Sequence, residues 1–387
     1  MSHIIAKSSK VLMVVYGLIL ALLLVYSYAL IDPNLTFFNS SIWTAFRNRM
    51  VYLGYYQRPL SWNIYLTLVA LLFLFHFILV KKSRQISVIK VAFLIGAVLM
   101  LSYPFLSHDF FNYLFDAKIA TFYHQNPYFR RALDFPQDEW TRFMHWTHRT
   151  YPYGPVFLVI TLVPSFLSFG KFLPDFILFK LTFIGFYLAA VYSLSHINKK
   201  SAIEFATHPL VIIEGLVNAH NDLIGLSLAL FGIYYLFQNK KWQARLFLLL
   251  SGGIKYVTMP LLFVTKKHRR LNLLLLTIII TIIVYVSWRL EIESWYFLTL
   301  FAFMPVFNKI ISRLNIFLVG LLLSYYPYIY LGGWDTQNKL DLKHQIIGFF
   351  LVANVVYLLV ISLIAWRRGN FSVSALLSSR EHTSDQT

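Results

Sequence analysis

The sequence predicts an all-α polytopic membrane protein. Its 387 residues are 58% hydrophobic and 13% charged, whereas soluble domains average about 25% charged residues. Apolar runs of about twenty residues recur along the chain, long enough for helices to cross a hydrocarbon core of roughly 30 Å. Lys and Arg gather in the short loops between these runs, as the positive-inside rule expects of cytoplasmic loops. A membrane β-barrel would instead show short segments of alternating hydrophobicity.

Composition also excludes several classes of function. The formal net charge of +18 does not indicate a nucleic-acid partner, because the basic residues are divided among membrane loops. The chain has no cysteine, which excludes disulfides, thiolate metal sites and cysteine nucleophiles. The basic loop clusters are Lys81, Lys82 and Arg84; Lys199 and Lys200; Lys240, Lys241 and Arg245; Lys266, Lys267, Arg269 and Arg270; Lys309 and Arg313; and Arg367 and Arg368.

Together with two irregular segments, the apolar runs predict about 10–12 transmembrane helices. The first run is longer than the apolar core of a signal peptide, so we expect an uncleaved span with its N-terminus inside. Segments 32–60 and 108–155 are then extracytoplasmic, and 370–387 is expected to be a disordered cytoplasmic tail. The expected spans are 11–31, 61–80, 88–106, 174–195, 203–217, 222–238, 271–289, 295–310, 313–331 and 346–366.

Two apolar segments do not fit as simple spans. Residues 156–169 are too short and need both flanks outside, so we expect a partly crossing helix. Residues 246–264 have basic clusters at both ends and contain Gly252, Gly253, Lys255 and Pro260. We expect a broken helix or hairpin there, and such backbone at membrane depth indicates a central cavity.

The polar segment 108–155 is the expected location of any chemistry. Asp109, Asn112, Asp116 and Tyr123 share one helical face, which predicts an amphipathic helix lying at the outer membrane surface. Asp109 can act as a general base toward a substrate hydroxyl, or it can simply cap the helix N-terminus. Asp116 is expected to be solvated or to pair with Lys118 or an Arg.

Metal binding is a weaker alternative in the same segment. His145 and His148 lie three residues apart with Glu139 nearby, and two histidines at that spacing can share a metal ion. An interfacial helix with interleaved aromatic residues explains them equally well. The chain contains no Asp-x-Asp sequence, which weakens the case for a metal-held diphosphate. We therefore expect neither a metal site nor a cofactor.

Two further groups of polar residues follow apolar runs. In Asn218-Ala219-His220-Asn221-Asp222, Asp222 either caps the next helix or serves a functional site. Lys255 lies inside a broken apolar segment and must find an anion, a carbonyl or water, unless it snorkels to the interface. A lipid-linked phosphate is one suitable anion. Glu204 and Glu214 raise the same question more weakly.

These motifs, in this order, resemble the integral-membrane glycosyltransferases of the C fold. Bacterial polyprenyl-phosphate-mannose-dependent mannosyltransferases are the most similar branch, and the resemblance covers about residues 105–260. The motifs that carry it are Asp109, Tyr113 and Asp116; Asn126-Pro127-Tyr128; Tyr153-Gly154-Pro155; His220-Asn221-Asp222; and Ile254-Lys255-Tyr256.

The resemblance implies an inverting glycosyltransferase of the plasma membrane whose active site faces outward. It would move a hexose, by resemblance mannose, from a polyprenyl-phosphate donor to a lipid or glycan acceptor. Residues 1–369 would form one integral-membrane domain, with 108–155 as the catalytic loop. By motif position Asp109 is the base. Lys255, His220, Asn221, Asp222 and Tyr153 would bind the donor, with Asp116, Asn126 and Tyr128 in support.

Two interpretations from other classes compete with this one. A transporter or lipid flippase would use the segment near Lys255 as a mid-membrane site, but such folds usually contain inverted repeats, which the sequence does not show. A non-catalytic scaffold of an envelope assembly would need neither Asp109 nor Lys255 beyond stability.

Overall fold

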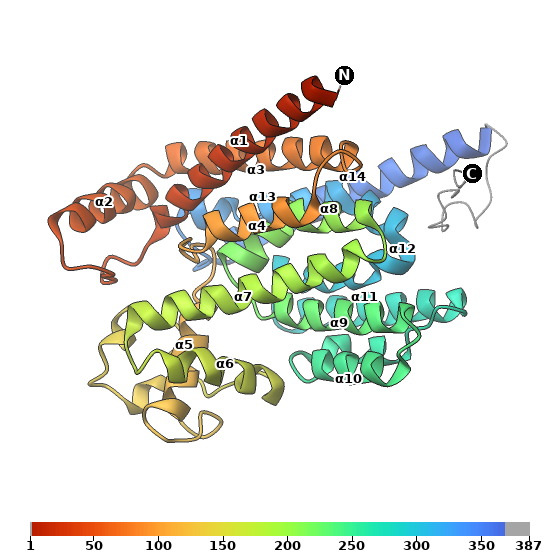
Figure 1. The fold of residues 1–387 in the computed structure, drawn as a ribbon. Coiled ribbons are helices and arrows are strands. Elements are labelled where there is room, and N and C mark those ends of the chain that lie inside the picture. Colours follow the sequence, from red (N-terminus) through yellow and green to blue (C-terminus); the bar gives the residue numbers. More distant parts are fainter. Residues whose placement is uncertain (1, 368–387) are drawn as a thin grey trace.

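The computed structural model describes residues 2–367, which are mostly helical and contain no strand. Figure 1 shows most of the helices lying side by side along one direction, as expected for an all-α membrane protein. The predicted tail at 370–387 lies outside the described residues. The α-helices are α1 (Ser2–Tyr26), α2 (Ser41–Val51), α3 (Arg58–Lys81), α4 (Val88–Leu99), α5 (Asp109–Thr121), α6 (Pro155–Leu167), α7 (Phe172–Ser195), α8 (Lys199–Thr207), α9 (Asp222–Phe237), α10 (Lys241–Gly252), α11 (Arg269–Arg289), α12 (Met304–Ile311), α13 (Asn315–Leu323) and α14 (Gln337–Arg367).

Several of these helices continue into 3₁₀ or π turns. The 3₁₀ segments of four or more residues are Ser27–Leu30, Glu139–Phe143, Tyr256–Phe263 and Ser294–Phe303, and the π segments are Tyr52–Tyr56, Val211–Val217 and Pro327–Leu331. By length and apolar composition, six described helical stretches can cross a membrane if residues 294–331 are counted as one, or seven if the bent pair at 211–237 is one span. The other expected spans are helical but short or broken.

The polar and the basic loops lie at opposite ends of the helices. At one end, Lys199 Nζ donates to the Arg84 carbonyl at 3.2 Å and joins two basic loops. At the other, Asn34 Nδ2 donates to the Arg142 carbonyl at 3.4 Å and joins the loop after α1 to the long polar segment. Figure 1 shows α2, α5 and α6 gathered at this second end. The arrangement agrees with the alternation of sides that the basic loops predict.

The predicted span 88–106 is wrong as a single helix, because α4 ends at Leu99. Pro104 has no N–H for a helical hydrogen bond and disfavours helical geometry at Tyr103. The extended chain instead passes through the protein interior, where Tyr103 N donates to Ser27 Oγ at 2.9 Å. Leu106 N then donates to Asn218 Oδ1 at 3.2 Å. This irregular stretch brings Asp109 toward the centre of the molecule.

The predicted surface location of the next helix is also wrong. Helix α5 is buried on all sides, including its polar residues Asn112, Asp116 and Lys118. It packs against α6 and α7, and residues 132–153 cover it. Lys118 Nζ lies 2.5 Å from Asp138 Oδ2 in that covering segment. A helix that looks amphipathic in sequence is thus internal, because its polar face meets other polar side chains rather than water.

The segment 246–264 forms the predicted hairpin. Helix α10 ends at Gly252, and the chain returns as the 3₁₀ segment Tyr256–Phe263 packed against it. The Arg245 guanidinium donates to the Leu262 carbonyl near the open end. Lys255 therefore lies at the tip of the hairpin, inside the protein.

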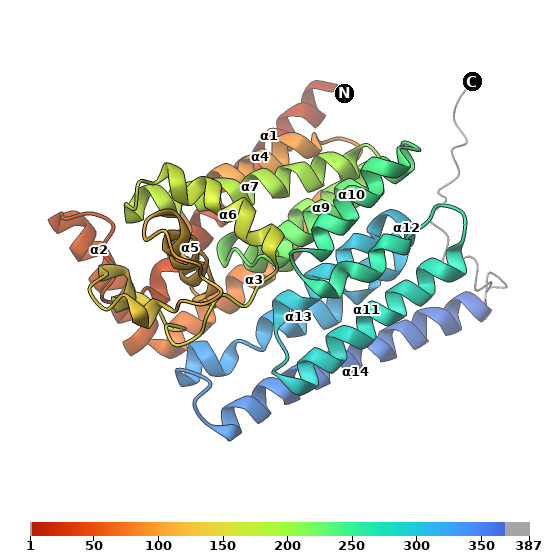
Figure 2. The ribbon, with the colours of Figure 1, turned by 90° about the horizontal axis from the view of Figure 1, so that it is seen from below.

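The C-terminal third folds back on itself. Ser294 Oγ donates to the Leu321 carbonyl at 2.9 Å, and the rings of Phe297 and Phe317 are 5.0 Å apart. A straight helix would separate Ser294 and Leu321 by about 40 Å at 1.5 Å per residue. Residues 294–331 therefore form two antiparallel segments, as the expected spans 295–310 and 313–331 require. Figure 2 shows α11, α13 and α14 grouped beside α9 and α10.

Candidate functional site

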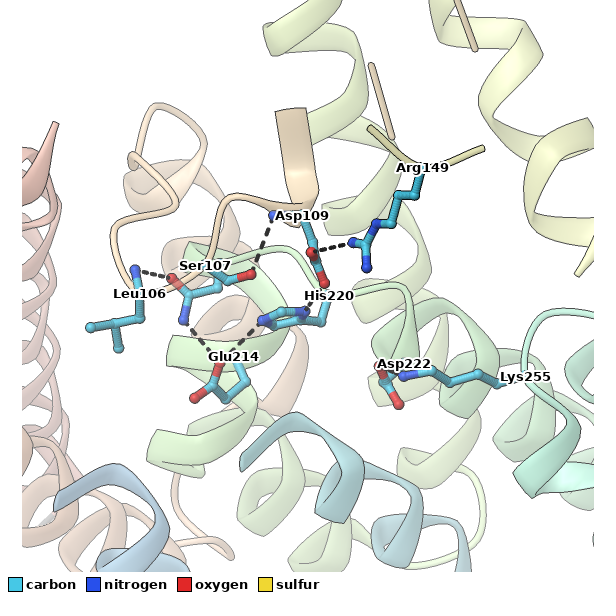
Figure 3. Close-up of polar contacts among 9 residues, drawn as sticks. Leu106, Ser107, Asp109, Arg149, Glu214, His220, Asp222 and Lys255 are labelled. Carbon is cyan, nitrogen blue, oxygen red and sulfur yellow. Dashed lines mark hydrogen bonds and ion pairs between the residues drawn. The ribbon is translucent and has the colours of Figure 1, made fainter. Parts of the chain in front are cut away.

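Three chain segments meet at one place inside the protein, shown in Figure 3. The first is the start of α5, with Asp109. The second is a bend of 110° between the π segment Val211–Val217 and α9, which carries His220 and Asp222. The third is the hairpin tip with Lys255. The residues predicted to act as base and donor ligands are thus brought together from distant parts of the sequence.

The Asp109 carboxylate is largely covered by protein and lies beside the Arg149 guanidinium and the His220 imidazole. Its Oδ1 lies 3.3 Å from Arg149 Nη2, its Oδ2 lies 3.9 Å from His220 Nδ1, and its side chain is 16% exposed. Burial raises the pKa of Asp109 above its usual value, and the positive charges of Arg149 and Lys255 oppose that rise. A general base works best when its pKa approaches the working pH. The capping alternative is wrong, because the carboxylate points to Arg149 and His220, and His108 holds the N-cap position.

Asp116 lies two turns further along α5 and is only 4% exposed. Burial raises its pKa to about 8, with the nearby Arg149 lowering it and Asp109 raising it. Asp116 is not solvated, because it is buried, and it does not pair with Lys118, because Lys118 pairs with Asp138. The nearby Arg149 favours the third alternative, an Arg neighbour. Burial thus favours the neutral form of Asp116 beside Arg149 and Asp109.

Arg149 is the main site residue that the sequence did not single out. It comes from the loop before α6, with its guanidinium 4.9 Å from the centre of the Trp146 ring. Its position next to two carboxyl groups depends on how residues 144–154 fold over α5. The segment 108–155 contains four arginines, Arg130, Arg131, Arg142 and Arg149, and nothing in their spacing distinguishes Arg149 from the other three.

His220 lies in the bend, stacked on Trp295 with ring centres 3.8 Å apart and planes 15° apart. Its Nε2 is 3.5 Å from Glu214 Oε2, and the ring is fully buried. Among the described residues, neither ring nitrogen has a hydrogen-bond partner of good geometry. The preceding Ala219 has a φ of 54°, a left-handed conformation that is uncommon outside glycine and occurs often at functional sites.

Lys255 forms an ion pair with Asp222 at the N-terminus of α9. Its ammonium group also lies 5.1 Å from the centre of the Tyr296 ring. Of the two alternatives for Asp222, capping of α9 is wrong, because Asn221 holds the cap position and the Asp222 carboxylate contacts Lys255. Lys255 does not snorkel to an interface. It is a cation fixed inside the site.

The hairpin tip is bound to the loop that precedes α6. Gly154 N donates to the Ile254 carbonyl and Val156 N to the Gly253 carbonyl, each at 3.3 Å. A Cβ atom on Gly154 would lie 2.0 Å from the Gly253 oxygen. The close approach of the two backbones therefore requires glycine at position 154.

A cavity of about 360 Å³ opens beside the Lys255–Asp222 pair. Its other walls are apolar, and part of them belongs to α11, a helix able to span a membrane. Hollows of about 470 and 560 Å³ lie at the basic end around Arg84 and Lys199, away from Asp109. The cavity beside the ion pair is lined by Asp222, Lys255, Tyr256, Val257, Ile282, Ile283, Val286 and Tyr296.

Of the remaining predicted residues, three lie in or next to the site and one lies outside it. Tyr153 lies in the site, with its ring 5.1 Å from that of Tyr113, and Tyr128 supports it by donating to its carbonyl at 3.2 Å. Asn221 is buried in the bend. Asn126 is exposed and accepts a hydrogen bond from Tyr128 N at 2.9 Å, so it forms a turn outside the site.

The two candidate metal ligands point to different neighbours. His145 stacks on His108 with ring centres 3.5 Å apart, and His148 packs against Trp146. Over residues 2–367, no group of three or more His, Asp or Glu side chains is placed to hold a metal ion.

Comparison with known proteins now adds to this geometry. A family model described as alpha-(1->6)-mannopyranosyltransferase, N-terminal domain (MptA_B family), matches residues 7–267. The chain belongs to this mannosyltransferase family. No curated protein and no solved structure matches the chain. The matched range contains Asp109, Arg149, His220, Asp222 and Lys255.

Family membership has two consequences for this mannosyltransferase. It favours the enzyme over the transporter and scaffold interpretations, because the matched family is defined by mannosyl transfer. Trp295 and Tyr296 contact His220 and Lys255 but follow the matched range. The C-terminal third thus contributes walls of the site that the family match does not cover.

Proposed function

We propose that this mannosyltransferase moves mannose from a polyprenyl-phosphate donor to a lipid or glycan acceptor, with inversion at the anomeric carbon. The reaction takes place on the extracytoplasmic side. The position of α5 and the polar loops at the end opposite the basic loops supports this side, because the positive-inside rule assigns basic loops to the cytoplasm.

One observation carries the proposed donor: a fixed cation stands at the edge of an apolar cavity. Lys255, paired with Asp222, suits a phosphate group, and the walls from α11 suit a hydrocarbon chain. A polyprenyl phosphate combines these two chemistries in one molecule. A soluble nucleotide sugar would leave the apolar walls without a partner.

Buried polar atoms without a hydrogen-bond partner support the proposal that a sugar binds beside the phosphate. Across the described residues, the two ring nitrogens of His220 and Asn221 Nδ2 are buried without a hydrogen-bond partner. Buried polar groups are nearly always paired in proteins or by what they bind. Hydroxyl groups of a hexose both donate and accept, and so can satisfy these atoms.

The proposed reaction uses Asp109 and Lys255 at opposite ends of one displacement. Asp109 takes the proton of the acceptor hydroxyl, and the hydroxyl oxygen forms a bond to the anomeric carbon. The bond from that carbon to the phosphate oxygen breaks, and polyprenyl phosphate leaves with the electron pair. Lys255 balances the charge that develops on the phosphate. Arg149 keeps Asp109 ionised between turnovers.

The test is transfer of labelled mannose from a polyprenyl-phosphate-mannose to a panel of lipid and glycan acceptors. Asp109→Asn should lower the rate by about 10²–10⁴-fold, the usual contribution of a general base. Asp134→Asn is the matched control, because Asp134 belongs to the same polar segment but pairs with Arg131 near the surface.

Two results would contradict the proposal. Full activity of Asp109→Asn would remove Asp109 as the base. Movement of the donor lipid across the membrane by the wild type, without any glycosylated product, would favour the transporter interpretation.

A further inference from the structure

A buried lysine of the last helix connects the C-terminal part of the chain to the site. Lys343 of α14 has a side chain only 3% exposed, and its Nζ lies 3.3 Å from Glu293 Oε1 and 3.6 Å from Glu291 Oε1. Its ammonium group is also 4.7 Å from the centre of the Trp334 ring. One cation thus contacts two carboxylates that precede the aromatic walls of the site.

The contacted segment leads directly to two site contacts. Ser294 follows Glu293 and donates to the Leu321 carbonyl at 2.9 Å, which anchors the segment on α13. Trp295 stacks on His220, and Tyr296 lies against Lys255 and lines the cavity. The placement of residues 291–296 therefore sets what surrounds the imidazole and the ammonium group.

Lys343 is the cation that contacts both carboxylates of this segment. Glu291 and Glu293 have side chains 28% and 21% exposed and share Lys343 as a partner. Burial raises the pKa of Glu293 to about 7, and the charge of Lys343 opposes that rise. His344 Nε2 also lies 2.7 Å from Glu291 Oε1, so Glu291 would keep a partner without the lysine. Glu293 would lose the cation that pairs with it beside the Glu291 carboxylate, and it would have to take up a proton or move toward water.

We propose that Lys343 is a positioning residue for the donor site. It holds the 291–296 segment so that Trp295 orients His220 and Tyr296 confines Lys255. The inference rests on the proposed function, since His220 and Lys255 are the proposed donor ligands. It assigns a role to a helix that lies outside the range matched by the family model.

The test compares Lys343→Met with Lys339→Met in the full-length protein. Lys339 is a matched control: it lies on the same helix and pairs with Asp335 at 2.6 Å, a pair that does not include Glu291 or Glu293. We expect Lys343→Met to raise the donor KM about 10-fold with a smaller change in kcat, the cost of a small displacement of positioning groups. Lys343→Arg should restore most of the donor affinity, and Lys339→Met should match the wild type.

A double variant separates positioning from simple charge balance. The double variant Lys343→Met, Glu293→Gln removes the repulsion between the two carboxylates but does not restore the contact between α14 and residues 291–296. The stability of the protein should therefore recover while the donor KM stays raised. A wild-type donor KM in Lys343→Met or in the double variant would overturn the inference.

Heat protection by polyprenyl-phosphate-mannose separates this outcome from failure of the proposed function. If the donor protects wild type and Lys343→Met equally, the positioning role falls and the donor site stands. If the wild type is neither protected nor active, the proposed function falls and this inference falls with it.

Discussion

Replacing Arg149 with glutamine should move the acid limb of the pH–activity profile to higher pH. In the proposed mechanism Asp109 must be ionised for transfer, so activity should fall as pH drops through the pKa of Asp109. Burial raises that pKa, and Arg149 opposes the rise. Removing the guanidinium therefore raises the pKa further, and the proton leaves Asp109 only at higher pH.

The magnitude follows from the separation of the two groups. Arg149 Nη2 and Asp109 Oδ1 are 3.3 Å apart, which gives an upper limit of about 5 kcal/mol at an effective dielectric constant of about 20. The Arg149 side chain is 37% exposed, so water screens much of this interaction. A shift of about 1–2 pH units remains, within the range measured for an Asp beside an Arg.

The assay is kcat/KM for labelled mannose transfer across a pH series, with Arg149→Lys as the charge-conserving control. The limb should move for Arg149→Gln and stay near its wild-type position for Arg149→Lys. An equal reduction of kcat/KM at every pH, with the acid limb at its wild-type position, would refute the reasoning. It would mean that Arg149 binds substrate without tuning Asp109.

Three further substitutions test other parts of the structure. Asp116→Asn should keep activity at neutral pH. It should also raise the melting temperature relative to the wild type, and this difference should grow as the pH rises from about 3.8 to about 8. The reason is that the folded wild type keeps this carboxyl protonated in that range whereas the unfolded chain ionises it. A difference that shrinks as the pH rises would contradict this. Lys118→Met should destabilise the protein by about 3–5 kcal/mol, because Asp138 loses the cation that pairs with it inside the protein; an unchanged unfolding midpoint in detergent would exclude that role. Gly154→Ala should lower transfer at least 10-fold, an order of magnitude typical of small displacements in a site, whereas Gly185→Ala, where a Cβ meets no atom within 4 Å, should behave as the wild type.

Local features of the sequence were sufficient for the membrane architecture. Apolar runs and basic loops predicted the long helices and the alternation of loops, because hydrocarbon thickness and charge placement act on short segments. The hairpin with Lys255 at its tip was predictable for the same reason: basic residues flank an apolar segment that contains Gly252, Gly253 and Pro260. The ordered motifs also predicted that Asp109, the 220–222 bend and Lys255 belong to one site, which the structure brings together.

The groups that surround each polar side chain were harder to predict than the positions of the helices and loops. The polar face of α5 has the same periodicity whether it meets water or, as here, Trp146, Arg149 and Asp138, so the surface helix was a wrong prediction. Capping was wrong for Asp109 and Asp222 because an Asp at a helix start has the same sequence signature when its carboxylate turns to a distant cation. The sequence also could not show that α4 ends at Leu99 so that residues 100–108 cross the interior.

The sequence by itself determined which residues could carry charge inside a membrane protein and on which side they emerge. Only the tertiary structure decided their partners: Arg149 beside Asp109, Trp295 on His220, Asp222 against Lys255, and Lys343 behind Glu293. Each of these contacts joins segments that are at least 33 residues apart, the separation of Asp222 and Lys255. Spacing along one helix reports neighbours three or four residues away, whereas such distant contacts depend on how every helix between them packs.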